Sequence, residues 1–519
     1  MPASAMRQDR VPKGVFTRDG VRPGQVIDCE VVVVGSGAGG ATVAAELAEA
    51  GFDVIVVEEG RYFSTRDFTA NASDMVRTLY RDAGTTMAVG RPPILYQEGR
   101  AVGGSTVING GMSWRTPERI LAEWRESYDV DWLDDDTMNL YFERVERRIH
   151  VGHQDPESVG RDNQLLREGA ERKGWDVIPN LRNQVHCPGS NNCAFGCPTG
   201  AKQSALVSYI PRALHFGARV YSDLRAMEIL RRGKRATGVR CHIMDRSYRS
   251  AGEVTIRAPI VVVACGSIHT PALLWRSGFK SPSGRLGKNL SLHPNIKVVA
   301  VMDQPVRGWE GVHQGYQVRE FGDQGISTLA AVNVPPSILA LAMPQYGDEL
   351  GAMLDQYDHM MIAGALIEDN TTGAVRRAPG GLPVATYELA KRDAAAAVEA
   401  ARRLSELLFE VGAKRVFLPF TGLHEISSPD QLGKIDPATI SRESMEVLTV
   451  HMMGTAAMGG DRSHAVTDSF GHVYDAEGLV IADASLFPGP VGVNPMETIM
   501  ALATRNAHYL IENRTRYLS

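Results

Sequence analysis

The sequence has few cysteines, no long apolar run and no large excess of charge of one sign. Only six of its 519 residues are cysteine, which argues against a disulfide-rich secreted framework. The most continuous apolar stretch, residues 327–345, contains two adjacent prolines, so we predict no transmembrane span. The first 20 residues lack the apolar core of a secretory signal, and we expect a cytoplasmic protein. A net charge of −5 gives no basic patch for nucleic acid.

The chain is long enough to build more than one hydrophobic core. A length of 519 residues exceeds the size at which one core keeps growing, so two domains are predicted. The composition, 44% hydrophobic and 22% charged, is typical of a soluble globular protein.

A glycine-rich turn follows the first long apolar run. Residues 31–34 are four valines, as expected of a strand that is buried on both faces of a parallel sheet. The glycines of a G-x-G-x-x-G pattern come next: Gly35, Gly37 and Gly40. This pattern lets backbone N–H groups approach a pyrophosphate at the start of a helix, which we predict over residues 39–50.

An acidic residue completes the nucleotide-binding pattern. A second apolar strand ends at Glu58, which lies 23 residues after Gly35. A carboxylate at this place binds both hydroxyls of a ribose, which favours FAD or NAD over NADP.

Three further stretches identify a family resemblance. They are "GRAVGGSTVINGGMSW" at residues 99–114, "GSIHTPALLWRSG" at residues 266–278, and the C-terminal "VHMMGTAAMGG" with "GLVIADASLFPGPVGVNPMETIMALA". The sequence resembles the glucose-methanol-choline (GMC) family of FAD-dependent oxidoreductases, and "LGKNLSLHPN" at residues 286–295 also looks like a family element. The "NGGM" run is closest in style to the cholesterol oxidase and long-chain alcohol oxidase branches.

The resemblance implies an α/β fold with a Rossmann-like FAD-binding domain and a discontinuous α+β substrate domain. The implied FAD-binding segments are residues 26–115, 200–300 and 445–519. The substrate domain would use residues 116–199, which carry a cysteine group, and residues 301–444. Within the last segment, the amphipathic pattern from residue 391 to 412 predicts a helix.

The resemblance also assigns further cofactor contacts. The residues expected around the flavin and the rest of FAD are Gly103, Gly104, Ser105, Asn109, Gly110 and Asp483. Some family members attach FAD covalently through a histidine just before the asparagine of the first stretch. Here that position is Ile108, so we expect noncovalent FAD.

The resemblance places a catalytic pair near the C-terminus. His451 would be the general base that removes the hydroxyl proton of an alcohol, because the pKa of histidine lies near working pH. Asn494 would hold the same oxygen by a hydrogen bond. Hydride transfer to the flavin would then give an aldehyde or ketone, and the electrons would pass to oxygen, a quinone or a redox protein.

The sequence is compatible with more than one substrate and more than one class of activity. Methionines between residues 343 and 361 favour a bulky or partly apolar alcohol, because thioethers line adaptable pockets. A sugar or aminosugar hydroxyl is the alternative substrate. A flavin and iron–sulfur electron-transfer protein that oxidises no alcohol is the alternative activity.

Half of the cysteines lie within eleven residues. Cys187, Cys193 and Cys197 form C-x5-C-x3-C, followed by Pro198, in a Gly- and Asn-rich loop. Loop thiolates that end in Cys-Pro are typical of iron–sulfur sites, and three would suit a 3Fe-4S cluster. A purely structural loop, a zinc site completed by His186 and a disulfide are the alternatives.

Overall fold

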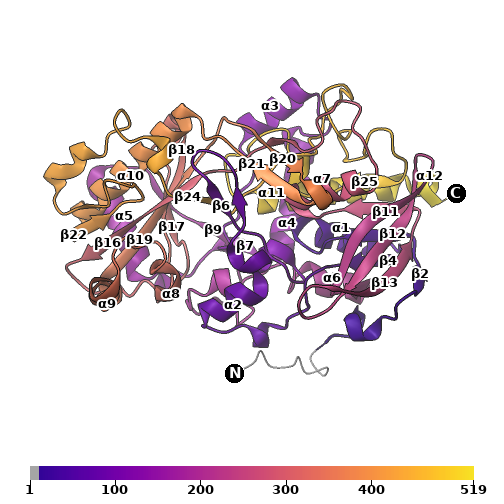
Figure 1. Cartoon of the computed structure of the whole chain (residues 1–519), viewed down its shortest axis with the longest axis horizontal. Helices are drawn as coiled ribbons and strands as arrows, with labels where there is room; N and C mark the ends of the chain where they lie inside the picture. The colour runs from indigo at the N-terminus through magenta and orange to yellow at the C-terminus, as the bar shows by residue number, and fades with distance from the viewer. Residues whose placement is uncertain (1–10, 519) are drawn as a thin grey trace.

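The computed structural model describes residues 11–518. Two sheets dominate it, one in each half of the molecule (Figure 1). Within the described part of the chain, no helix is both long and apolar enough to cross a membrane.

The first sheet has six strands, all parallel. Its central strand pairs on both sides, Val31 with Val54 and Val31 with Ile260. In spatial order the strands are β1 (Val15–Phe16), β10 (Arg219–Tyr221), β4 (Val54–Val57), β3 (Val31–Val34), β14 (Ile260–Val263) and β25 (Leu479–Ile481).

Apolar residues explain why this sheet is buried on both faces. Every residue of β3, β4 and β14 is buried, as in parallel sheets that helices cover on both sides. The helices of this half include α1 (Ala38–Glu49), α4 (Asp135–Ile149), α6 (Tyr209–His215), α7 (Gly266–Arg276) and α11 (Met496–Glu512). This arrangement confirms the predicted Rossmann-like α/β fold.

The second sheet is mixed and has ten strands. Its central strands are antiparallel, with Lys297 of one opposite Gly364 of the next. Its strands are β5 (Met87–Ala88), β6 (Ile94–Tyr96), β8 (Val177–Pro179), β16 (Asn295–Met302), β17 (Tyr316–Val318), β18 (Ile326–Ala331), β19 (Met360–Ile367), β22 (Ala413–Phe417), β23 (Glu425–Ile426) and β24 (Val447–Thr449).

Two helices cover one face of the second sheet, α5 (Arg161–Lys173) and α10 (Lys391–Glu410). The helix predicted from residue 391 is confirmed. Val398, Ala401 and Leu408 lie on its buried face, as the amphipathic pattern predicts.

The remaining elements are smaller sheets and helices outside the two large sheets. A four-stranded sheet contains β11 (Leu224–Arg232), β12 (Arg235–Met244), β13 (Ser250–Arg257) and β2 (Val26–Asp28). Smaller sheets contain β15 (Lys288–Leu290), β20 (Gly373–Arg377) and β21 (Pro383–Thr386), and β7 (Val151–His153) with β9 (Leu181–Asn183). The other α-helices are α2 (Ala72–Leu79), α3 (Glu118–Tyr128), α8 (Pro336–Leu339), α9 (Gly347–Leu354) and α12 (Arg514–Leu518).

Some strands and helices pack in the core of the other sheet, and not in the one expected for their segments of the sequence. Strands β5, β6 and β24 fall in segments 26–115 and 445–519, yet they pair within the ten-stranded sheet. Helix α4 falls in segment 116–199, but Phe142 and Val145 pack in the core of the six-stranded sheet. Strand pairing and buried helix faces decide which core a segment joins, and order along the chain does not reveal them.

Candidate active site

Glycine backbones bring the ends of three parallel strands together. Gly35, directly after β3, has φ of +100°, and a Cβ there would lie 2.2 Å from the Ala264 carbonyl oxygen after β14. A Cβ on Gly39 would lie 1.6 Å from the Ala482 oxygen after β25. Only glycine allows these approaches, so the pattern predicted from the sequence is also a packing requirement.

The first turn of α1 is open on the side that a cofactor would approach. A Cβ built on Gly37, the N-cap of α1, would meet only one atom within 4 Å, the Cα of Gly104 at 3.9 Å. Gly40 is tight by contrast, because its Cβ would lie 2.0 Å from the Gly35 oxygen. Backbone N–H groups at Gly37 can therefore face a phosphate without a side chain between them.

Glu58 lies at the carboxyl end of β4, as predicted, and is buried. One of its oxygens accepts hydrogen bonds from the backbone N–H and the hydroxyl of Ser36, at 3.0 and 2.7 Å, and the other accepts from the Gly60 N–H. Burial raises the pKa of this carboxyl. The Ser36 hydroxyl also accepts a hydrogen bond from the Gly103 N–H. Ser36 therefore connects Glu58 to the glycine-rich stretch at residues 99–104.

The structure brings most of the expected cofactor residues to this edge of the sheet. Gly103 begins a short 3-10 turn in a left-handed conformation, and a Cβ on Gly104 would lie 2.7 Å from the Gly37 Cα. Ser105 accepts a hydrogen bond from the Gly99 N–H. The carboxylate of Asp483 accepts from the N–H groups of Gly266 and Ser485 and from the hydroxyl of Thr270.

Asn109 and Gly110 lie where this segment meets α11. The amide nitrogen of Asn109 lies 3.0 Å from the sulfur of Met496, and its side-chain oxygen is buried without a hydrogen-bond partner. A Cβ on Gly110 would lie 2.2 Å from the Gln314 amide oxygen. An N–H group of a bound flavin would satisfy the Asn109 oxygen, so this edge fits FAD in its donors, its acceptors and its bare backbone.

His451 and Asn494 come together as the resemblance predicts. The side-chain nitrogen of Asn494 lies 3.4 Å from Nε2 of His451. The other ring nitrogen of His451, Nδ1, lies 3.2 Å from Nδ1 of His293. His293 lies in "LGKNLSLHPN", but the sequence assigned no role to it.

When both histidines are neutral, a hydrogen bond between their Nδ1 atoms requires that only one of these atoms carries a hydrogen. If the Gly492 N–H donates to Nε2 of His293, at 3.3 Å, a neutral His293 carries its hydrogen on Nδ1. If Asn494 donates to Nε2 of His451, a neutral His451 carries its hydrogen on Nδ1 instead. The two contacts therefore require opposite tautomers, and only the second leaves a lone pair on Nε2 of His451 for a substrate proton.

Burial keeps both imidazoles neutral. It lowers the pKa of His451 to about 4, because the charged ring would lose its hydration. Burial and the neighbouring His451 lower the pKa of His293 well below its usual value. At neutral pH, His451 is therefore a base that holds no extra proton.

Hydrogen bonds fix the backbone around this pair. The Thr449 hydroxyl lies within hydrogen-bond distance of the His293 and His451 carbonyl oxygens, at 3.2 and 3.1 Å. His293 has φ of +51°, a conformation uncommon for a residue other than glycine. The Asp369 carboxylate holds it there by accepting from the N–H groups of Leu292 and His293 and from the Tyr387 hydroxyl. Burial raises the pKa of Asp369 to about 7.

The structure does not support the iron–sulfur cluster expected at Cys187, Cys193 and Cys197. All three cysteines are free, and in the described residues no group of three or more His, Cys, Asp or Glu side chains could hold a metal ion. Cys197 accepts a hydrogen bond from the Lys202 N–H at 3.4 Å, and Cys193 lies 3.6 Å from an Arg182 nitrogen. This corrects the 3Fe-4S and zinc hypotheses and favours the structural-loop alternative.

A buried lysine accounts for the conformation of the cysteine loop. The Lys202 ammonium donates to the carbonyl oxygens of Val107, Asn109 and Cys193, at 2.8, 2.8 and 2.7 Å. Burial lowers its pKa to about 8. The loop is therefore tied to the segment that contains Asn109, a link that a count of cysteines does not reveal.

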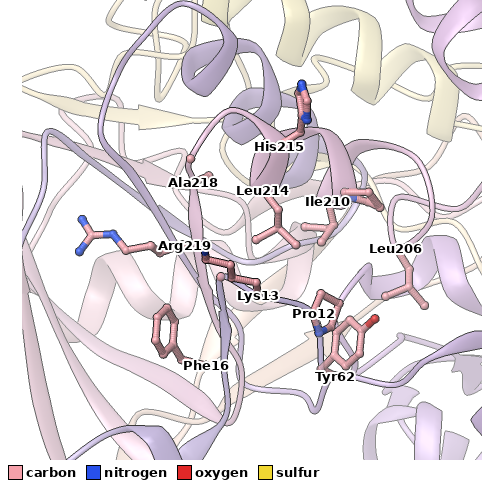
Figure 2. A pocket seen from close by; sticks show the side chains of 13 residues that line it. Pro12, Lys13, Phe16, Tyr62, Leu206, Ile210, Leu214, His215, Ala218 and Arg219 are labelled. Carbon is pink, nitrogen blue, oxygen red and sulfur yellow. The ribbon is translucent and has the colours of Figure 1, made fainter. Parts of the chain in front are cut away.

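A surface pocket of about 660 Å³ lies beside β1 and α6, apart from the residues described so far (Figure 2). Phe16, Tyr62, Leu206 and Leu214 give it a largely apolar lining, with Lys13 beside them. None of its lining residues is a predicted catalytic or cofactor-binding residue.

Comparisons with known proteins agree with this geometry. The sequence matches family models described as GMC oxidoreductase over residues 76–295 and 370–503, and an FAD binding domain over residues 30–83. An uncharacterised GMC-type oxidoreductase of Mycobacterium tuberculosis is 36% identical over 479 residues, 92% of this chain and 75% of that protein.

Two more distant relatives extend the comparison. A long-chain-alcohol oxidase of Arabidopsis thaliana is 27% identical, over 98% of this chain and 69% of that protein. The structure of a formate oxidase variant of Aspergillus oryzae shares the fold, with a TM-score of 0.71 and 15% identity over 96% of this chain and all of that one. By these sequence matches, the chain belongs to the GMC oxidoreductase family of FAD-dependent enzymes.

Proposed function

We propose that this enzyme oxidises an alcohol to an aldehyde or ketone, with His451 as the general base and Asn494 as its hydrogen-bonding partner. The observation that carries the proposal is the 3.4 Å contact between the Asn494 side chain and Nε2 of a buried, neutral His451. The contact of Met496, two residues after Asn494, with Asn109 supports a position of this pair beside the segment proposed to hold the flavin.

The side chains divide the reaction between them. Nε2 of His451 accepts the hydroxyl proton, and the Asn494 amide donates a hydrogen bond to the same substrate oxygen. FAD, when bound at Gly37, Glu58, Asn109 and Asp483, supplies the acceptor for the hydride. The electrons then leave to oxygen, a quinone or a redox protein.

His293 is proposed as a positioning residue for the base. In the tautomer in which Asn494 donates to Nε2 of His451, the Nδ1–H of His451 donates to the lone pair on Nδ1 of His293, and His293 carries its hydrogen on Nε2 and gives up the Gly492 N–H as a donor. This hydrogen bond persists when His451 takes the substrate proton on Nε2. This acceptor stabilises the imidazolium that forms during the reaction, in a site where burial otherwise disfavours charge. The Asp369 contacts keep His293 in place for this role.

A bulky or partly apolar alcohol remains the proposed substrate, with a sugar or aminosugar as the alternative. The face of the ten-stranded sheet opposite α10 carries an apolar cluster under α8 and α9. Its buried members include Val299, Val301, Met343 and Met360. Flexible thioethers in such a cluster suit an apolar substrate body.

Anaerobic mixing with a panel of alcohols tests the proposed activity. A long-chain primary alcohol should bleach the flavin absorbance in a single turnover and yield the aldehyde. Bleaching by aminosugars alone would support the alternative substrate. Oxidised flavin with every alcohol in the panel would contradict alcohol oxidation altogether.

FAD should be released intact by acid precipitation. Ile108 occupies the position from which a histidine attaches FAD in some family members, and an isoleucine side chain cannot form that bond. The measurement is the flavin absorbance of the supernatant and of the protein pellet. Flavin that stays with the pellet would contradict noncovalent binding.

The His451→Ala variant should slow flavin reduction by a factor on the order of 10² to 10⁴, the usual contribution of a positioned general base. Asn494→Ala and His293→Ala should slow it less, because each removes one supporting hydrogen bond. His464→Ala, at a strongly exposed histidine, is the matched control and should reduce normally. Normal reduction in His451→Ala would remove this residue from the mechanism.

The rate of flavin reduction should vary little between about pH 8 and about pH 6. A histidine at its ordinary pKa of about 6.5 would be half protonated within that range and unable to act as a base. Because burial lowers the pKa of His451 to about 4, the base stays neutral and the rate should fall only as the pH approaches that value. A rate that halves near pH 6.5 and loses this dependence in His451→Ala would contradict the neutral, buried base.

A further inference from the structure

Lys297 is a cation in the middle of the second sheet. It lies on β16, where Ile296, Val298 and Ala300 face the core under α10. Because side chains alternate along a strand, Lys297 shares the opposite face with Asn295 and Val299. Val299 belongs to the apolar cluster under α8 and α9, so Lys297 stands between that cluster and the start of the strand.

This lysine has no partner among residues 11–518. It forms no side-chain hydrogen bond and no salt bridge there, although protein surrounds it closely enough to lower its pKa to about 8. The side chain keeps part of its surface exposed, so it faces a space that water can enter. An ammonium held in protein without an anion is costly, which makes an unpaired lysine at this place unusual.

The neighbouring polar group is also unsatisfied. The side-chain oxygen of Asn295 is buried without a hydrogen-bond partner. Gly364, opposite Lys297 on β19, contributes no side chain between them, and a Cβ there would lie 3.3 Å from the Asn295 oxygen and 3.5 Å from Cγ of Lys297. The two polar side chains therefore line one continuous strip of this face.

The strip begins beside the catalytic pair. Asn295 is two residues after His293 and pairs across the sheet with Leu448, three residues before His451. Lys297 lies one side-chain repeat further along the face, about 7 Å from Asn295. Burial, with smaller contributions from Arg182, Lys202 and Lys297, lowers the pKa of the His313 imidazole to about 3. His313 lies beside Gly110, since a Cβ there would be 3.1 Å from the His313 ring.

We propose that Lys297 binds an anionic group of the alcohol substrate, so that the enzyme acts on hydroxy acids with an apolar body. The hydroxyl would lie at His451, the carboxylate would pair with the Lys297 ammonium, and the apolar part would lie along the strip between them. This inference rests on the proposed alcohol oxidation for the place of the hydroxyl. A carboxylate at Lys297 would supply the missing anion, which an uncharged alkanol cannot do.

Two matched alcohols test the preference. Anaerobic flavin reduction is followed with ω-hydroxydodecanoate and with dodecanol, which share the reacting end and differ in charge at the other. The apparent Kd for ω-hydroxydodecanoate should rise about 10- to 100-fold in Lys297→Met, the range expected for a hydrogen bond to a charged group, while that for dodecanol stays unchanged. Lys280→Met, at an exposed lysine, is the control and should bind both alcohols normally.

A ligand that cannot react separates this inference from the proposed function. Dodecanoate has no hydroxyl, so its binding, measured as a shift of the flavin absorbance spectrum, requires no turnover. Binding to the wild type that is lost in Lys297→Met supports the anion site, even if no alcohol reduces the flavin and the proposed activity fails. Equal dodecanoate binding by both proteins, or binding by neither, would overturn the inference.

Discussion

Close contact between backbones at glycine is the constraint on which the site depends. A Cβ at Gly35, Gly39 or Gly104 would lie between 1.6 and 2.7 Å from backbone atoms of another segment. These contacts hold the ends of β3, β14 and β25 and the segment around Asn109 in one place. Glu58 and Asp483 are buried at this edge, where their carboxylates accept hydrogen bonds from backbone N–H groups.

The part of the site that is local in the chain could be predicted from the sequence. A strand, a glycine turn, a helix and Glu58 lie within 30 residues, and each follows from hydrophobic pattern and turn chemistry. His451 and Asn494 came from the family resemblance, because a spacing of 43 residues does not by itself bring two side chains together. The role of His293 depends on pairing between segments far apart in the chain, and no local pattern encodes that pairing.

Charged side chains within the protein explain two features that the sequence did not reveal. These are the conformation of the cysteine loop and the unpaired lysine on the second sheet. Three thiols suggested a cluster, but the buried Lys202 ammonium fills the loop with hydrogen bonds to carbonyl oxygens. His451 and His293 are neutral by contrast. In the proposed mechanism His451 takes a proton on Nε2 and His293 accepts the Nδ1–H of His451. Lys297 adds a charge on the face of the second sheet opposite α10 that no residue among 11–518 balances.

The central claim is that His451 removes a hydroxyl proton while the adjacent carbon gives up a hydride. It is tested most directly by anaerobic single turnover of the FAD-loaded enzyme with a long-chain alcohol and with the same alcohol deuterated at the carbinol carbon. The account predicts slower flavin bleaching with the deuterated alcohol, and aldehyde equal in amount to the flavin reduced. Equal rates over a range of alcohol concentrations and pH, or bleaching without aldehyde, would contradict it.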